Sequence, residues 1–380
     1  MKIHAALGMA ALSLGHFVTF VQPVQAQEAS NIVIYGLVDS GLSYYSNSVA
    51  LNGGQVAASG AALRLDNGIA AGNRIGFSGS EDLGGGMSAV FKLENGFDAA
   101  KGSLGQGGLL FGRQSYVGLN TTAGLWSIGR QYDFMFDYLN LMGYTNAGHN
   151  NIGASGQGLD GMSAIAATAQ LGNHTYGARV NNALKFSSNS FAGFRFGALL
   201  GLGEQAGSQS RGGTAQAGVN YAQGNFLIGA VAGVSSVLGS DNQYATKRVA
   251  GAGAKLTLDK LALYGSYTQV RFDGLVSYAP RGVDWTGARV DTLDVGADYQ
   301  FTPVVNGGLS WQHQIRNGEL SYADQLTASL SYSLSKRTSL YSTLAYQRDR
   351  AFGALNVFGA GAPSDNGVQL VSRVAMRTAF

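Results

Sequence analysis

The chain of 380 residues contains no cysteine and only four prolines. Without cysteine it can form neither a disulfide framework nor a thiolate metal site. Charged residues are also scarce, at 12% of the sequence, which is about half of their usual share in a globular domain. The formal net charge of +3 is close to neutral for this length. The composition therefore argues against a nucleic-acid partner, and we expect no metal and no cofactor.

The chain also lacks long apolar runs after its first segment. Residues 5–21 are largely apolar, follow a basic start and precede small residues that end at Ala26. No later run approaches the ~20 apolar residues of a membrane-spanning helix. We expect residues 1–26 to be a cleaved secretory signal peptide and residues 27–380 to form one mature domain. A lone transmembrane anchor fits less well, because the apolar stretch is short and a cleavage pattern follows it.

Alternation with a period of two is the strongest pattern that is present. Leu, Ala and Tyr alternate with Ser and Thr over residues 326–335, and residues 292–301 repeat the pattern. The final segment places Arg373 and Arg377 between apolar positions and ends on Phe380. Strands that are apolar on one face and polar on the other suit a wall between lipid and water.

Turn signals divide the chain into about 16 such strands. Short Gly-, Asn- and Asp-containing turns alternate with longer polar, Gly-rich stretches. These stretches are residues 46–72, 98–108, 132–173, 203–213, 237–246, 272–288, 316–320 and 349–366. The sequence thus predicts an all-β fold, a transmembrane antiparallel up-and-down β-barrel with one plain rim and one elaborated rim. About 16 strands leave room for an aqueous channel.

Several sequence blocks carry a family resemblance. They are Asn31-Ile-Val-Ile-Tyr-Gly-Leu-Val-Asp39, Arg74-Ile-Gly-Phe77, Gly79-Ser-Glu-Asp-Leu-Gly84, Phe111-Gly-Arg-Gln-Ser-Tyr-Val-Gly-Leu119, Gly129-Arg-Gln-Tyr-Asp133, Leu334-Ser-Lys-Arg-Thr338 and the terminal Phe380. In these blocks the chain resembles Gram-negative general porins of the betaproteobacterial type. The resemblance implies an outer-membrane homotrimer of 16-stranded barrels that passes small hydrophilic solutes and ions. It also implies a third long loop that folds inward and narrows each pore.

The resemblance assigns the candidate site residues. The longest loop, residues 132–173, matches the constriction loop, while Arg74, Arg113 and Arg179 match the arginines of the facing wall. Arg130 lies where the fifth strand enters this loop, and a β-bulge is needed to turn it inward. The alternation independently places Arg74 in the lumen, because Ile75 and Phe77 face outward. The energy agrees with this placement, since an arginine facing lipid at mid-depth costs about 2–4 kcal/mol. A plainer interpretation is that these arginines only solvate the wall.

The loop departs from cation-preferring relatives in its acids. No acid lies between Asp137 and Asp160, so the constriction keeps its positive side and loses its negative one. We expect an anion-preferring channel, with Asp133 and Asp137 bracing the base of the loop. His149 and Asp160 lie further along the loop, where Asp160 is the candidate acid near the pore.

Four aromatic residues at the loop entrance leave two interpretations open. Tyr132, Phe134, Phe136 and Tyr138 could form a slide for sugars, as in a substrate-specific porin. The preferred interpretation is that they anchor the loop against the wall.

Two other classes of function are alternatives. An outer-membrane hydrolase needs a nucleophile with a base in reach, but His149, His174 and His313 lie in no hydrolase block and have no metal-ligand spacing. A purely structural barrel is the other class. The resemblance also implies contacts with outer-membrane lipid and lipopolysaccharide, and it makes Phe380 part of the signal that barrel-insertion machinery recognises. Gly36 and Gly41 are expected on the outer face of the first strand, in close packing with a second barrel.

Overall fold

The computed structural model describes residues 31–52, 55–144, 179–208, 210–238, 243–273, 289–316, 321–350 and 367–380. These residues form strands β1 (Asn31–Asn52), β2 (Gln55–Asn67), β3 (Arg74–Gly84), β4 (Met87–Gly96), β5 (Gln114–Asn120), β6 (Gly124–Tyr132), β7 (Arg179–Ser188), β8 (Phe194–Gly201), β9 (Thr214–Gln223), β10 (Phe226–Leu238), β11 (Tyr244–Leu258), β12 (Leu261–Asp273), β13 (Arg289–Thr302), β14 (Val305–Arg316), β15 (Ser321–Ser333), β16 (Thr338–Arg350) and β17 (Val368–Ala379), and a π-helical turn η1 (Met135–Tyr144). Within the described ranges, no helix has the length and apolar character needed to cross a bilayer.

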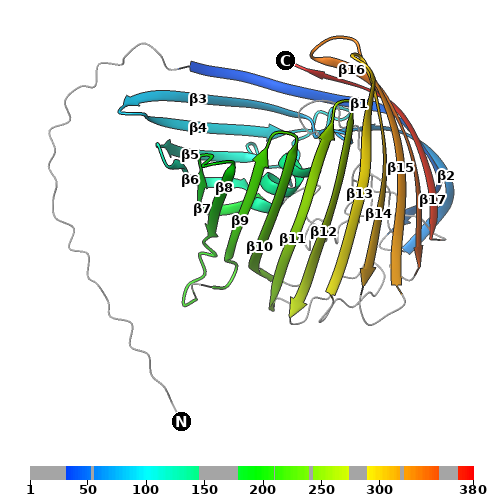
Figure 1. The fold of residues 1–380 in the computed structure, drawn as a ribbon. Helices are drawn as coiled ribbons and strands as arrows, with labels where there is room; N and C mark the ends of the chain where they lie inside the picture. Colours follow the sequence, from blue (N-terminus) through cyan, green and yellow to red (C-terminus); the bar gives the residue numbers. More distant parts are fainter. Residues whose placement is uncertain are drawn as a thin grey trace.

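The strands close into a barrel. From β3 onward each strand pairs antiparallel with the next, and β17 pairs with β1 from Leu37 opposite Ala379 to Tyr45 opposite Val371. The strands of the near wall therefore cross those of the far wall in Figure 1, as tilted strands around a cylinder must. The predicted up-and-down barrel is confirmed.

The second strand of the barrel is interrupted and consists of β2 and β3, so the 17 strand segments correspond to 16 strands of the barrel wall. One edge of β1 pairs with β3 through residues 31–37 and with β2 through residues 40–52. Only two β1 residues thus lie opposite residues 68–73, which cannot remain in the wall. The loop expected over residues 46–72 is therefore wrong for most of its length. The small, weakly apolar residues of β2 show little alternation, so the sequence did not reveal the β1–β2 hairpin that backbone hydrogen bonds form.

Side chains alternate between the two faces as predicted. On β15, Leu326 and Leu330 are about half exposed on the outer face, whereas Thr327 and Ser331 are 1% exposed on the inner one. On β17, Val374 faces outward and Arg373 inward. The barrel is therefore apolar outside and polar inside, the arrangement that a wall between lipid and water requires.

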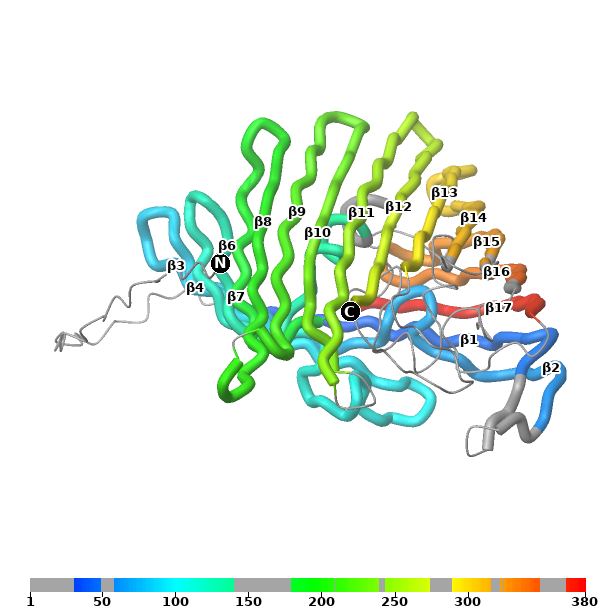
Figure 2. The backbone as a smooth tube through the Cα atoms, turned by 90° about the horizontal axis from the view of Figure 1, so that it is seen from below, coloured from blue at the N-terminus to red at the C-terminus, as the bar shows by residue number. Residues whose placement is uncertain are grey.

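The two rims differ in the length of their connections. At one rim tight turns join the strands, and the turn after β3 runs through Gly84, Gly85 and Gly86, which all have positive φ angles (+78°, +61° and +77°) that favour glycine. Long connections join the strands at the other rim. Figure 2 shows the barrel turned by 90°, with the hairpins of β8 to β12 side by side. The predicted plain and elaborated rims are present.

Candidate functional site

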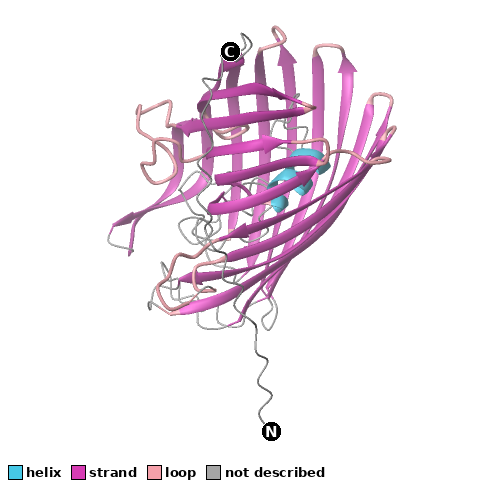
Figure 3. Cartoon of the chain, turned by 90° about the vertical axis from the view of Figure 1, so that its left-hand side faces the viewer, coloured by secondary structure: helices cyan, strands magenta, loops and turns pink. Residues whose placement is uncertain are grey.

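The chain enters the barrel interior where β6 ends. Figure 3 shows the helical turn η1 lying within the ring of strands. The Asp133 carboxylate accepts a hydrogen bond from the Phe136 N–H (3.0 Å) and another from the Gln216 side chain (3.2 Å). The Gln216 side-chain oxygen Oε1 in turn accepts a hydrogen bond from the Phe134 N–H (2.5 Å). Asp133 therefore caps η1 and ties its start to β9.

Glycines on the inner wall make room for η1. Phe134, Met135 and Leu139 are fully buried. A Cβ atom at Gly251 on β11 would lie 2.7 Å from the Leu139 Cδ1 atom, and one at Gly218 on β9 would lie 2.8 Å from the Tyr138 ring. The turn fits only against a wall without side chains at these points.

This packing decides between the two interpretations of the entrance aromatics. Phe134 is 0% and Tyr138 is 5% exposed, and both lie against the wall. Tyr132 and Phe136 instead stack on each other with ring centroids 3.8 Å apart. Loop anchoring is confirmed for the first pair, and a continuous slide of four rings is not formed.

We predict that Gly251→Leu disturbs the channel without unfolding the barrel. The added side chain must displace Leu139 and Met135, and overpacking of this kind costs about 1–3 kcal/mol. The displaced turn narrows the lumen, so single-channel recordings should show a lower and noisier conductance. Gly265→Leu on the outer face of β12 is the control with the same substitution, because its Cβ atom would meet its first neighbour only at 3.4 Å and lies away from η1. An unchanged conductance in folded Gly251→Leu protein would contradict the prediction.

Asp137 contacts the wall beside the root of the loop. It forms an ion pair with Lys185 of β7, whose ammonium group also donates to the Tyr132 carbonyl (2.7 Å) and lies 4.7 Å from the centroid of the Phe134 ring. The structure thus places Asp133 and Asp137 at the base of the loop. Lys185 was missed, although its alternation with outward-facing Leu184 could have placed it in the lumen.

Tyr132 lies at the centre of the arginine group. Arg179 donates from Nη2 to the Tyr132 hydroxyl (2.7 Å), and its Cζ atom is 4.7 Å from the ring centroid. The Cζ atom of Arg113 is 5.9 Å from the same centroid. The hollow of about 290 Å³ beside Tyr132 is also lined by Arg74 and Lys185. Side chains that are distant in sequence therefore meet beside the loop root.

Arg130 lies beside this group, close to Arg179 and Tyr132. The pairing of β6 with β7 shifts register at Arg130, but the extra residue lies on β7, where two residues lie opposite Arg130 alone. Ser127 and Gln131 both remain on the inner face of β6, so this irregularity does not supply the bulge on β6 that the sequence required. Its Nε atom donates to the Gly112 carbonyl (2.8 Å), and Nη1 donates to the Asn181 side chain. Both partners are uncharged, so these bonds orient the guanidinium without cancelling its charge.

A buried carboxylate accompanies Arg113. The Arg113 Nε atom lies 2.6 Å from Oε1 of Glu94 on β4, and the two residues are 6% and 2% exposed. Tyr35 donates to the other Glu94 oxygen (2.8 Å), and Lys92 is 3.9 Å away. Arg113 immediately precedes β5, so it lies at the end of a strand of the wall. Glu94 was missed, although Lys92 and Glu94 are two residues apart and therefore share one face of β4.

The remaining sequence candidates lie elsewhere. His149 and Asp160 fall outside the described residues, as does His174. His313 lies on the outer face of β14, where it stacks on Trp311 and contacts Asp324 at 2.8 Å. Within the described part of the chain, no group of three or more potential ligands could hold a metal ion.

Comparisons with known proteins agree with this geometry. The model of a family described as Gram-negative porin matches residues 10–351. An outer membrane porin protein of Bordetella pertussis is 28% identical over 86% of this chain and 91% of its own length. The "Outer membrane porin protein 32" of Delftia acidovorans is 26% identical over 88% and 89%. The solved structure "Anion-selective porin from Comamonas acidovorans" superposes with a TM-score of 0.76 at 23% identity, covering 93% of this chain and all of that one.

Proposed function

The chain belongs to the Gram-negative porin family, and from that premise we propose that its channel prefers anions. It is an outer-membrane porin that lets small hydrophilic solutes pass by diffusion. The observation that carries the preference is the grouping of Arg74, Arg113, Arg130 and Arg179 around the loop root. We assign the constriction wall to these four residues.

The balance of charge at the loop root supports this proposal. Glu94 pairs with Arg113, and Asp137 pairs with Lys185, so two of the positive charges are compensated. Asp133 is a third carboxylate at the loop root, where four arginines and Lys185 outnumber the three acids. Arg74 instead donates to the Gly72 carbonyl (2.9 Å), Arg130 to a carbonyl and an amide, and Arg179 to a phenol. Low-dielectric walls focus the field of such charges into a narrow lumen. Anions are therefore concentrated there and cations are depleted.

Reversal potentials in planar bilayers test the preference. In a tenfold KCl gradient we expect the sign that corresponds to chloride preference, with a magnitude that falls in concentrated salt. Screening causes the decrease, because the Debye length is about 10 Å at 0.1 M and about 3 Å at 1 M. A channel that selects potassium would overturn the proposal and would leave the family assignment unaffected.

The relatives and the family are channels, and we further propose that the protein is not a hydrolase. A lipid-hydrolysis assay on purified protein tests this point. A sugar-specific channel is disfavoured, because three of the four candidate aromatic residues, Tyr132, Phe134 and Tyr138, are buried. We also propose that residues 1–26 are removed and that residues 27–380 form the mature protein. Sequencing the N-terminus of the membrane-extracted protein tests that boundary.

We propose a homotrimer as the assembled state. The short strands β5 and β6 expose Val117 (60%), Trp126 (47%) and Ile128 (61%) on their outer face, which suits contact with a second barrel. The expectation for two glycines changes with the structure. Gly36 is covered by the Phe380 ring, and Gly41 faces inward beside Ala375 rather than outward. Neither glycine therefore presents a free outer surface for contact with a second barrel.

Lipopolysaccharide is the proposed lipid partner at the elaborated rim. The outer ends of β11 to β16 carry a belt of ionic and aromatic side chains next to the long connections. The belt consists of Arg248, Tyr267, Arg271, Asp273, Arg289, Asp291, Trp311, His313, Tyr322, Asp324 and Arg348. Arginines on the outer face need anionic or polar headgroups beside them, because hydrocarbon would not solvate them. The belt thus supports a phosphate-bearing outer leaflet as its partner.

A further inference from the structure

Residues 68–73, which we call the inward segment, join β2 to β3 on the inside of the barrel. Ile69 packs on a buried cluster of Tyr45, Ala345 and Val371, and Ala70 packs on a second cluster of Tyr341 and Ala375. These cluster residues belong to the inner faces of β1, β16 and β17. The inward segment therefore crosses the seam where the last strand meets the first.

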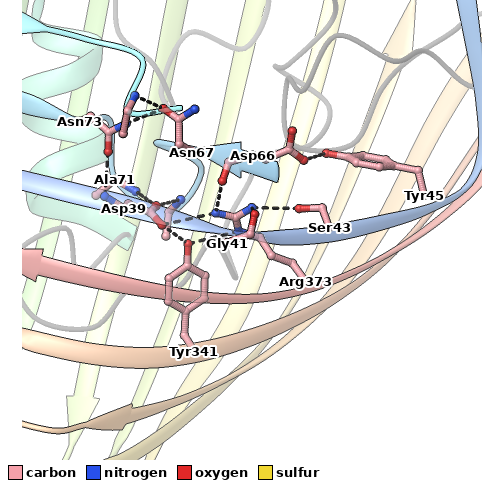
Figure 4. A network of polar contacts seen from close by, with 12 residues as sticks. Asp39, Gly41, Ser43, Tyr45, Asp66, Asn67, Ala71, Asn73, Tyr341 and Arg373 are labelled. Carbon is pink, nitrogen blue, oxygen red and sulfur yellow. Dashed lines mark hydrogen bonds and ion pairs between the residues drawn. The ribbon is translucent and has the colours of Figure 1, made fainter. Parts of the chain in front are cut away.

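A group of three buried side chains holds the inward segment at this seam (Figure 4). Asp39 of β1 accepts the N–H groups of Ala70 (2.7 Å) and Ala71 (3.1 Å) on its Oδ2 atom. Its Oδ1 atom accepts the hydroxyl of Tyr341 on β16 (2.5 Å) and lies 3.4 Å from the guanidinium of Arg373 on β17. We call Asp39, Tyr341 and Arg373 the seam cluster. Their exposed fractions are 0%, 4% and 1%.

Arg373 joins the cluster to two further residues, Ser43 and Asp66, and also bonds Tyr341 within it. It donates to the Ser43 hydroxyl (2.9 Å), the Asp66 carbonyl (3.2 Å) and the Tyr341 hydroxyl (3.3 Å). The planar guanidinium can satisfy several acceptors at once, which an ammonium group cannot do in this geometry. The cluster is complete only when β1, β16, β17 and the inward segment are all in place, which requires a closed barrel.

The other end of the inward segment contacts the arginines of the channel. The Gly72 carbonyl accepts the Nε–H of Arg74 (2.9 Å), and a Cβ atom at Gly72 would lie 2.8 Å from Nη1 of Arg113. Between these contacts and the seam, the Asn73 side chain accepts the backbone N–H of Asp39 (2.7 Å). A continuous set of contacts thus runs from the seam cluster to Arg74 and Arg113.

We propose that the seam cluster is a positioning site for the channel: closure of β17 on β1 fixes the inward segment, and the inward segment fixes Arg74 and Arg113. The seam cluster itself adds little field to the lumen, because Asp39 and Arg373 carry opposite charges in one buried group. The cluster affects selectivity only by fixing the positions of Arg74 and Arg113. The electrical part of the proposal rests on the proposed anion preference.

Tyr341→Phe tests the proposal with a second, independent readout. The variant keeps the ring on Ala70 and removes the hydroxyl that joins Asp39 to Arg373. Because the chain has no cysteine, the thiol introduced by Ala70→Cys reports on the inward segment alone. We expect a membrane-impermeant thiol reagent to label it about fivefold faster in the Tyr341→Phe background, the factor that one lost hydrogen bond gives to a local opening equilibrium. The reversal potential should move toward zero in the same protein.

The controls separate positioning from stability. Tyr264→Phe removes a buried hydroxyl on the inner face of β12, for which the described residues provide no hydrogen-bond partner, and it should change neither readout. If Tyr341→Phe yields too little heat-modifiable barrel, Ser43→Ala removes one bond to Arg373 and should give the same shifts at smaller size.

Two results would overturn the positioning role. One is folded Tyr341→Phe protein with wild-type labelling, and the other is faster labelling with unchanged reversal potential and conductance. Failure of the proposed anion preference can be distinguished from both of these results. A cation-selective wild type would refute the anion preference, while the seam variants would still have to differ from it in labelling and in conductance.

Discussion

Replacement of Arg74, Arg113 and Arg179 by glutamine should move the reversal potential from chloride preference to zero or to potassium preference. The guanidiniums of Arg113 and Arg179 lie by the Tyr132 ring, and Arg74 lines the hollow beside it, so we expect the three to raise the potential at the loop root. A decrease of about one kT in that potential changes the ratio of anion to cation permeability about sevenfold, because the two concentrations shift in opposite directions. Bilayer recordings in a tenfold KCl gradient measure this ratio, and the difference from wild type should shrink in concentrated salt.

A control with the same change in charge isolates the position of these arginines. Arg211, Arg271 and Arg337 lie in a loop, on the outer face and in a turn, so their replacement by glutamine should leave the reversal potential nearly unchanged. Since Arg113→Gln leaves Glu94 buried with one partner fewer, the double variant of Arg74 and Arg179 serves as a second test with that ion pair intact. Equal selectivity in the wild type and both variants would show that other residues determine it.

Glu94→Gln should act in the opposite direction. It removes the carboxylate that compensates Arg113 and keeps a side chain of the same shape for Tyr35 to contact. Chloride preference should therefore increase in the same bilayer assay, by an amount that salt reduces. A shift toward potassium would mean that Glu94 acts mainly by holding Arg113 in place.

Local patterns in the sequence predicted the fold because a barrel wall is built from local alternation. The outer and inner positions of β13, β15 and β17 follow directly from their apolar and polar residues, and short turns mark their ends. The pattern failed on residues 46–72, where Ala, Gly and Ser carry little face preference. There the position of β2 in the wall is determined by backbone hydrogen bonds to β1, which the sequence of β2 alone does not reveal.

The site was predictable to a lesser extent, because its contacts join distant segments. The register argument places Arg74 on the lumenal face, where it lines the hollow beside Tyr132. The irregularity at Arg130 has its extra residue on β7, so the bulge expected on β6 is not formed there. Glu94 and Lys185 show the same alternation with apolar neighbours, which would have placed both side chains in the lumen. The seam cluster joins Asp39 to residues about 300 positions later, and only the closed barrel brings them together. No local pattern marks Arg373 as a partner of Asp39.

Deletion of Phe380 should sharply reduce the yield of folded, heat-modifiable protein in membranes. The residue makes two separate kinds of contact at the end of the closing strand, and we expect each to have its own role in assembly. Its backbone exchanges two hydrogen bonds with Gly36 (3.0 and 3.1 Å), which ends the seam between β17 and β1. Its ring covers Gly36 and remains 53% exposed on the outer face, where insertion machinery could contact it. Deletion removes both, so it should have a larger effect than any single substitution there.

Three substitutions separate the two roles of Phe380. Phe380→Tyr keeps the ring and the backbone bonds, so it should assemble at nearly the wild-type level. Phe380→Ala keeps only the backbone bonds, and low yield in this variant would assign the effect to the ring. Gly36→Ala leaves the C-terminus intact but forces the ring off the first strand, because a Cβ atom there would overlap it. If recognition of an exposed terminal ring is what matters, Gly36→Ala should assemble well while its melting temperature falls. Wild-type yield in the deletion variant would show that neither role limits assembly.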